Sequence, residues 1–311
     1  MRPRFAVGGE NLIDHVTNDG QVSAKVGGSP FNVAMGLGRL GADVFYVSPI
    51  STDPWGGKLA STLSASGVKL SGRRVDLPTT MARVEVTNGH PSYRFEREGT
   101  AERAVDLDWI DARIAGADAV HTGSLTLTKG EDAEAWVLAL ASAFSRKQFV
   151  SVDPNVRMSV VEDADAYRAR ILTVCGSAHF IKLSDEDLAA LFPAQSEATA
   201  IAALRDIASA ELIVLTSGAQ GASAFLGSFR VEIDAAPVPS LIDAVGAGDT
   251  FMATLLWALS ANGCLHPSKL KELRLDLLRA ILVQASIAAA INCGREGCDP
   301  PTAAELEGAL V

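Results

Sequence analysis

Short apolar runs alternate along the chain with longer segments rich in alanine and leucine. Predicted strands lie at 5–10, 44–50, 119–125, 149–155, 179–184 and 212–218. Several of them are apolar at consecutive positions, as in parallel strands buried on both faces. The longer segments predict helices at 29–41, 56–68, 131–144, 163–175, 185–192, 197–209 and from 249 onward. This alternation predicts an α/β protein with a mainly parallel sheet flanked by helices.

One region departs from this pattern. From Thr79 to Arg97, apolar and polar residues alternate around Asn88-Gly89, which predicts an antiparallel hairpin. Residues 15–26 show a similar alternation around Asp19-Gly20. A small β-rich addition to an α/β body predicts a lid over a binding site, and a hairpin that only covers a sheet edge is the alternative.

Composition and charge narrow the class of protein. The chain has 311 residues and a net charge of −10, which disfavours binding to nucleic acid or to an anionic membrane. The apolar stretch from Ile281 to Cys293 is interrupted by polar side chains and predicts a buried helix rather than a membrane span. The N-terminus lacks the apolar run of a signal peptide, and the four cysteines form no CxxC pair. Free thiols of this kind predict a cytoplasmic protein.

The stretch DAVGAGDTF at 243–251 has the composition of an anion-binding turn. It lacks the third glycine of a dinucleotide fingerprint and the Gly-Lys-Ser/Thr of a Walker loop. Backbone N–H groups at Gly246, Ala247 and Gly248 would open a helix, where unpaired donors bind anions. Asp249 could accept a proton from a hydroxyl there, or it could cap the helix.

A second glycine-rich stretch precedes the helix predicted at 29–41, with Ser29 as its expected N-cap. Gly27 and Gly28 would let the backbone approach a ligand closely. Asp14 and Asn32 could then exchange hydrogen bonds with hydroxyl groups. A flexible turn followed by a solvated asparagine is the alternative.

Polar residues follow three further predicted strands. Arg157 could bind an anion in a bidentate geometry through its guanidinium group, or form a salt bridge in an ordinary turn. Ser184 and Asp187 begin a helix, where they could cap it or bind a hydrated Mg²⁺. Thr216 is followed by Gly218 and Gly221, which would admit an adenine or ribose but also suit a plain turn.

Two long motifs resemble signatures of the PfkB (ribokinase-like) family of carbohydrate kinases. They are GGSPFNVAMGLGRLG at 27–41 and DAVGAGDTFMATLL at 243–256. The intervening motifs are most similar to those of bacterial fructokinases. The resemblance covers essentially the whole chain and implies a three-layer α/β/α body in one domain, with a lid at about 12–26 and 73–104. It also implies a homodimer.

The resemblance implies transfer of the γ-phosphoryl group of ATP to a sugar hydroxyl, with fructose to fructose 6-phosphate as the first candidate. A kinase for 2-keto-3-deoxygluconate, with Arg157 facing the carboxylate, a ribose or nucleoside kinase, and a non-catalytic binding protein are the alternatives. Asp249 would be the base and 246–248 the anion hole. Further positions implied are Asp14, Gly27, Gly28, Asn32 and Arg97 for the sugar; Lys182, Thr216, Gly218, Gly221, Asn292 and Gly297 for ATP; Ser184 and Asp187 for Mg²⁺ through water; and Asp243 for a monovalent cation such as K⁺.

Overall fold

The computed structural model describes residues 3–18, 21–87 and 90–310. Its main sheet has nine strands in the order β15-β14-β13-β12-β11-β10-β1-β4-β6. Neighbouring strands are parallel from β13 to β6, and β14 and β15 are added antiparallel. The strands are β1 (Arg4–Val7), β4 (Asp43–Tyr46), β6 (Lys69–Leu70), β10 (Ala119–Gly123), β11 (Phe149–Asp153), β12 (Phe180–Ser184), β13 (Leu212–Thr216), β14 (Ala222–Leu226) and β15 (Phe229–Ile233).

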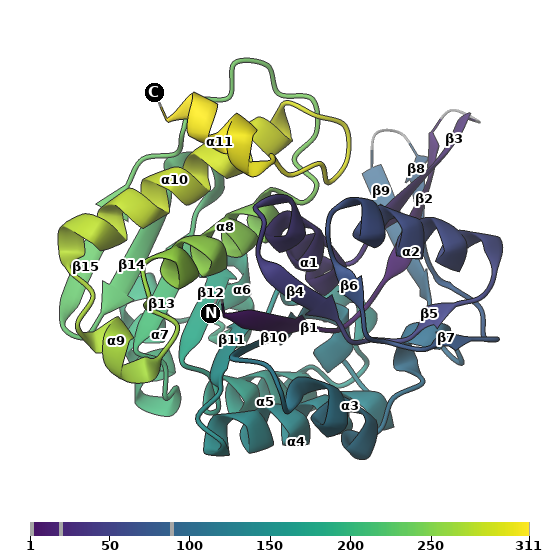
Figure 1. The fold of residues 1–311 in the computed structure, drawn as a ribbon, viewed down its shortest axis with the longest axis horizontal. Helices are drawn as coiled ribbons and strands as arrows, with labels where there is room; N and C mark the ends of the chain where they lie inside the picture. Colours follow the sequence, from purple (N-terminus) through teal and green to yellow (C-terminus); the bar gives the residue numbers. More distant parts are fainter. Residues whose placement is uncertain (1–2, 19–20, 88–89, 311) are drawn as a thin grey trace.

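Helices cover both faces of this sheet, which confirms the predicted α/β class (Figure 1). On one face lie α1 (Ser29–Arg39), α2 (Pro54–Ala65), α8 (Ala247–Ala261), α9 (Pro267–Lys271) and α10 (Leu275–Cys293), with α11 (Ala303–Ala309) packed on α10. On the other lie α3 (Leu107–Ile114), α4 (Glu131–Ser145), α5 (Ala164–Cys175), α6 (Asp185–Leu191) and α7 (Glu197–Ile207). Each face has its own large cluster of buried apolar side chains.

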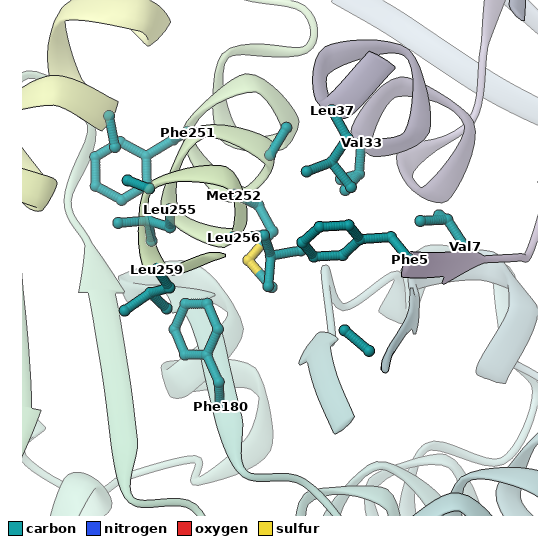
Figure 2. Packing of buried hydrophobic residues seen from close by; sticks show 14 of the residues in the cluster. Phe5, Val7, Val33, Leu37, Phe180, Phe251, Met252, Leu255, Leu256 and Leu259 are labelled. Atoms are coloured by element: carbon teal, nitrogen blue, oxygen red, sulfur yellow. The ribbon is translucent and has the colours of Figure 1, made fainter. Parts of the chain in front are cut away.

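The core on the α1 and α8 side fixes these two helices against the sheet. Figure 2 shows Met252 and Leu256 of α8 beside Phe5 of β1, and Leu259 beside Phe180 of β12. Burial of each such side chain contributes about 1.5–3 kcal/mol. Because both helices begin at the same end of the sheet, this packing brings their first turns close together.

A second sheet has the order β3-β2-β8-β9. It contains β2 (Leu12–Asn18), β3 (Gln21–Gly27), β8 (Thr80–Thr87) and β9 (His90–Glu96). The predicted hairpins correspond to the antiparallel pairs β2–β3 and β8–β9, and β2 and β8 join them in parallel. The turn residues 19–20 and 88–89 lie outside the described residues. A short pair, β5 (Ile50–Ser51) and β7 (Arg74–Val75), is parallel.

The sequence pattern did not predict β14, β15, α3 or α11. Strand β15 alternates buried and exposed residues at the sheet edge, so it lacks the consecutive apolar positions of the central strands. Helix α10 begins at Leu275, six residues before the predicted apolar stretch. Among the described helices, α10 is long and apolar enough to cross a membrane by length and composition. Its buried residues Leu278, Ile281, Leu282 and Ala285 belong to the core cluster beneath it.

Candidate active site

A cavity of about 660 Å³ opens where the central parallel strands end. Open α/β sheets bind ligands at this edge because the strand-to-helix loops converge there. The second sheet, the first turns of α1 and α8, and β12 contribute its walls. Sequence-predicted residues that line it are Asp14, Gly28, Asn32, Arg157, Lys182, Asp243, Gly246, Gly248, Asp249 and Gly297.

Asp249 is held by helix α1 and does not cap its own helix. Its Oδ1 accepts a 2.6 Å hydrogen bond from Ser29 Oγ, and its Oδ2 accepts a 2.8 Å bond from Asn32 Nδ2. The N-cap of α8 is Gly246, and no side chain within the described ranges caps this helix. Burial raises the pKa of Asp249, and the hydrogen bonds from Ser29 and Asn32 oppose this shift. The carboxylate is therefore oriented, and its proton affinity is higher than that of a solvated aspartate.

Ser29 does not have the N-cap role that we predicted. The N-cap of α1 is Gly28, at a φ of 112° that favours glycine, and no side chain of the residues that the structure describes caps the helix. The Ser29 backbone N–H donates to Glu10 Oε1 at 3.1 Å, while its hydroxyl donates to Asp249. Glu10 Oε2 also accepts from the backbone and hydroxyl of Thr126. Sequence reasoning missed Ser29 and Glu10 because neither contact is local in the chain.

The turn before α8 has the geometry of a helix-start anion site. Gly246 has a φ of 76°, and a Cβ there would collide with Cys298. The Ala247 N–H already donates to the Ala244 carbonyl. At this helix start, the backbone N–H groups of Gly246 and Gly248 therefore supply the hydrogen-bond donors for an anion, since the first N–H groups of a helix have no acceptor within it. A positive charge lies close by, because a Cβ at Gly248 would be 3.1 Å from Lys182 Nζ.

Lys182 is buried and paired. Its Nζ lies 2.9 Å from Asp153 Oδ2, and the nearby carboxylates keep its pKa raised although burial opposes this. Among the described residues, Asp153 Oδ1 has no hydrogen-bond partner. An anion entering the cavity would therefore meet a fixed ammonium group beneath the glycine turn.

Ser184 and Asp187 do not face the cavity. Asp187 Oδ1 accepts from the Val156 N–H at 2.6 Å and Oδ2 accepts from the Ser184 N–H at 2.8 Å, while Ser184 Oγ accepts from the Asp187 N–H. Oδ2 and Ser184 Oγ thus form the capping box of α6, while Oδ1 fixes the loop after β11, so these groups do not fit direct Mg²⁺ binding. Within the described ranges, no group of three His, Cys, Asp or Glu residues is placed to hold a metal ion.

Arg97 also lies away from the predicted sugar position. It is 8% exposed and pairs with Glu102 at 2.8 Å. Its Nη1 donates to the Leu125 carbonyl and to Thr128 Oγ1. Its neighbour Phe95 lines the cavity instead. Glu96 pairs with Arg83, on the adjacent strand, at 2.8 Å.

A second, mainly apolar groove of about 630 Å³ adjoins the cavity and shares Ala244 and Gly248 with it. The predicted residues Thr216, Gly218, Gly221 and Ala247 line this groove. Its apolar walls include Val238, Leu241, Phe251, Ala289, Ala290 and Cys293. A flat aromatic base suits such walls, and its phosphates would point toward the glycine turn.

Asn292 supports the turn rather than lining either cavity. Its Nδ2 donates to the Val245 carbonyl at 2.8 Å, and its Oδ1 accepts from Thr250 Oγ1 and from the Asp299 N–H. Gly27 lies behind Asp14, where a Cβ would collide with the Asp14 carboxylate. Both residues shape the site from outside its surface.

The Asp243 carboxylate is surrounded by hydrogen-bond donors. Oδ1 accepts from the Val245 N–H at 3.0 Å, and Oδ2 accepts from the Gly297 N–H at 2.9 Å and from Lys25 Nζ at 3.3 Å. Burial would raise the pKa of Asp243, but these bonds outweigh it and hold the pKa below its usual value. The Lys25 ammonium already supplies a positive charge at Oδ2, so a K⁺ at the predicted position beside Asp243 would have to displace it.

The burial of Asp14 predicts that sugar binding depends on pH. Burial raises its pKa to about 6, Lys25 opposes this and Asp249 adds to it. If Asp14 accepts hydrogen bonds from a sugar, KM for the sugar should rise as the pH falls through about 6, because the protonated carboxyl is a weaker acceptor. Steady-state KM measured from pH 5 to 8 tests this, with Asp14→Asn expected to have a high KM and no inflection. An unchanged inflection in that variant would contradict the assignment.

The fold and the site together define a class of protein. An oriented carboxylate, a helix-start anion site and an apolar groove that reaches the same turn are the features of a small-molecule kinase. The chain belongs to the pfkB family of carbohydrate kinases, whose family pattern matches residues 9–304.

Individual relatives agree with this family. The chain is 34% identical to a fructokinase of Rhizobium leguminosarum bv. trifolii, over 87% of this chain and 84% of that protein. It is 25% identical to a Vibrio cholerae fructokinase solved with fructose, ADP and calcium, with a TM-score of 0.84 over 100% and 99% of the two chains. A Xylella fastidiosa fructokinase with bound ATP shares the fold, at 23% identity and a TM-score of 0.91 over 100% and 98%. The chain is a carbohydrate kinase with the ribokinase-like α/β fold.

Proposed function

We propose that the protein transfers the γ-phosphoryl group of ATP to the 6-hydroxyl of fructose. The observation that supports this proposal most directly is the position of Asp249, which lines the polar cavity. The preceding residue, Gly248, lines both this cavity and the apolar groove. The sugar would occupy the polar cavity and the nucleotide the groove. The fructokinase relatives support fructose as the acceptor.

In this proposal Asp249 takes the proton of the sugar hydroxyl. The hydroxyl oxygen then bonds to the γ-phosphorus, and the bond from that phosphorus to the β–γ bridging oxygen breaks to release ADP. Gly246 and Gly248 N–H groups and the Lys182 ammonium stabilise the negative charge that develops. Asp153 holds Lys182 in place through the 2.9 Å contact.

Mg²⁺, when bound with ATP, would neutralise phosphate charge. Its ligands would be phosphate oxygens and water, since Asp187 and Ser184 are engaged in helix capping. The sheet β3-β2-β8-β9 would act as the lid within a single 1–311 domain and exclude water from the transfer. The four free cysteines favour a cytoplasmic protein, and a homodimer stays a prediction.

A coupled assay of ADP release tests the proposal. Fructose, ribose, 2-keto-3-deoxygluconate and adenosine should be compared at equal concentrations, and fructose should have the highest kcat/KM. A preference for the sugar acid would assign Arg157, which also lines the cavity, to its carboxylate. Absence of turnover with every acceptor would contradict a kinase function.

A further inference from the structure

Lys25 places an ammonium group at the edge of the catalytic cavity. It lies on β3 in the second sheet, opposite Asp14 of β2. Its Nζ is 3.1 Å from Glu296 Oε1 and 3.3 Å from Asp243 Oδ2. Its aliphatic stem passes Gly297, where a Cβ would be 3.1 Å from Lys25 Cδ. The lysine therefore joins the second sheet to the two loops that flank the anion turn.

The carboxylate that Lys25 contacts organises those loops. Asp243 binds Val245 N–H just before the glycine turn, and it binds Gly297 N–H in the loop after α10. The nearby Val245 carbonyl accepts from Asn292 Nδ2. The two backbone N–H partners of Asp243 carry no net charge, so the Lys25 ammonium supplies the positive charge at this carboxylate.

The local charge balance also favours an ammonium group here. Lys25 interacts electrostatically with three carboxylates, those of Asp14, Asp243 and Glu296. Partial burial would lower the pKa of Lys25, but its hydrogen bonds to Glu296 and Asp243 outweigh this and raise it. The side chain is thus charged throughout the neutral pH range.

We infer that the Lys25 ammonium serves as a built-in monovalent cation at Asp243, so that the enzyme needs no added K⁺. This inference rests on the proposed kinase function only where its test measures kcat. The ammonium supplies one positive charge, as K⁺ would, and directs hydrogen bonds to the carboxylate. Because Lys25 belongs to β3, its contact with Asp243 also links the position of the second sheet to the conformation of the glycine turn before α8.

The test compares wild type, Lys25→Ala and Lys58→Met in tetramethylammonium chloride and in KCl at equal ionic strength. Lys58 is a matched control, since its Nζ also contacts β3, at the Ala24 carbonyl, but not Asp243. Wild type and Lys58→Met should be equally active in both salts. Lys25→Ala should lose roughly 10-fold in kcat in tetramethylammonium, the factor for one lost charge-assisted hydrogen bond. KCl or NH₄Cl should restore much of that loss.

A second readout does not depend on the acceptor sugar. The Tm of Lys25→Ala should rise in KCl relative to tetramethylammonium chloride, because the vacated site binds the cation in the folded state, whereas that of wild type should not. Strong K⁺ stimulation of wild type would overturn the inference. So would a Lys25→Ala variant whose Tm and activity ignore K⁺ and NH₄⁺. If no acceptor is turned over, the Tm comparison alone decides.

Discussion

Asp249→Asn should lower kcat roughly 10²-fold or more, the usual scale for loss of a general base. The amide has nearly the shape of the carboxylate, so the fold should persist. Its oxygen can accept from Asn32 Nδ2, which only donates, and its NH₂ can face Ser29 Oγ, which can turn to accept. Proton acceptance is therefore the property that is lost, and KM for ATP should change little. Steady-state kinetics and the Tm measure both parts.

Ser29→Ala is the matched control for this experiment. It keeps the carboxylate and removes one of the two hydrogen bonds that orient it, so its kcat should fall less than that of Asp249→Asn. A kcat unchanged in Asp249→Asn would contradict the assignment of the base, since the side chain has no capping role in α8 that could account for its burial.

Arg97→Met should destabilise the protein by about 3–5 kcal/mol, because it leaves a buried charge without its partner. Glu102 is 3% exposed and is held by Arg97 Nε at 2.8 Å and by Thr80 Oγ1 at 3.0 Å. Burial raises the pKa of Glu102 and the Arg97 charge lowers it, so removal of Arg97 should favour the protonated acid. Urea unfolding at pH 7 measures the change.

The double variant Arg97→Met/Glu102→Gln separates charge from packing. Glutamine removes the unpaired charge and can still accept from Thr80, so the double variant should be more stable than Arg97→Met alone. KM for the sugar should be nearly unchanged in whichever variant folds. A large rise in KM with no loss of stability would instead return Arg97 to the sugar-binding role that the sequence resemblance implied.

Much of the architecture follows from the sequence pattern. The runs rich in apolar residues at 149–155 and 212–218 predicted β11 and β13, because a strand between two helix layers is buried on both faces. Alternation at 79–97 predicted β8 and β9 because successive side chains of a strand point to opposite faces of its sheet. The edge strand β15 was missed, since sheet edges do not require consecutive apolar residues.

The site was only partly readable from the sequence. The glycine turn and Asp249 were found from local spacing, and the structure places both on the cavity wall. The sequence left Ser184 and Asp187 open between capping and Mg²⁺ binding. The structure assigns them to capping through their reciprocal hydrogen bonds, and it adds a bond from the Val156 N–H, in the loop after the neighbouring strand, to Asp187 Oδ1. Nothing local in the chain specifies that partner.

By itself, the sequence determined the α/β class, the family signatures and the candidate base, because periodicity and turn composition depend on neighbouring residues. Only the tertiary structure decided that Ser29 orients Asp249 from 220 positions away, that Arg97 pairs with Glu102, and that Lys25 meets Asp243. Hydrogen bonds and ion pairs form between whichever groups packing brings within about 3 Å, and helices and strands transmit that choice across the whole fold.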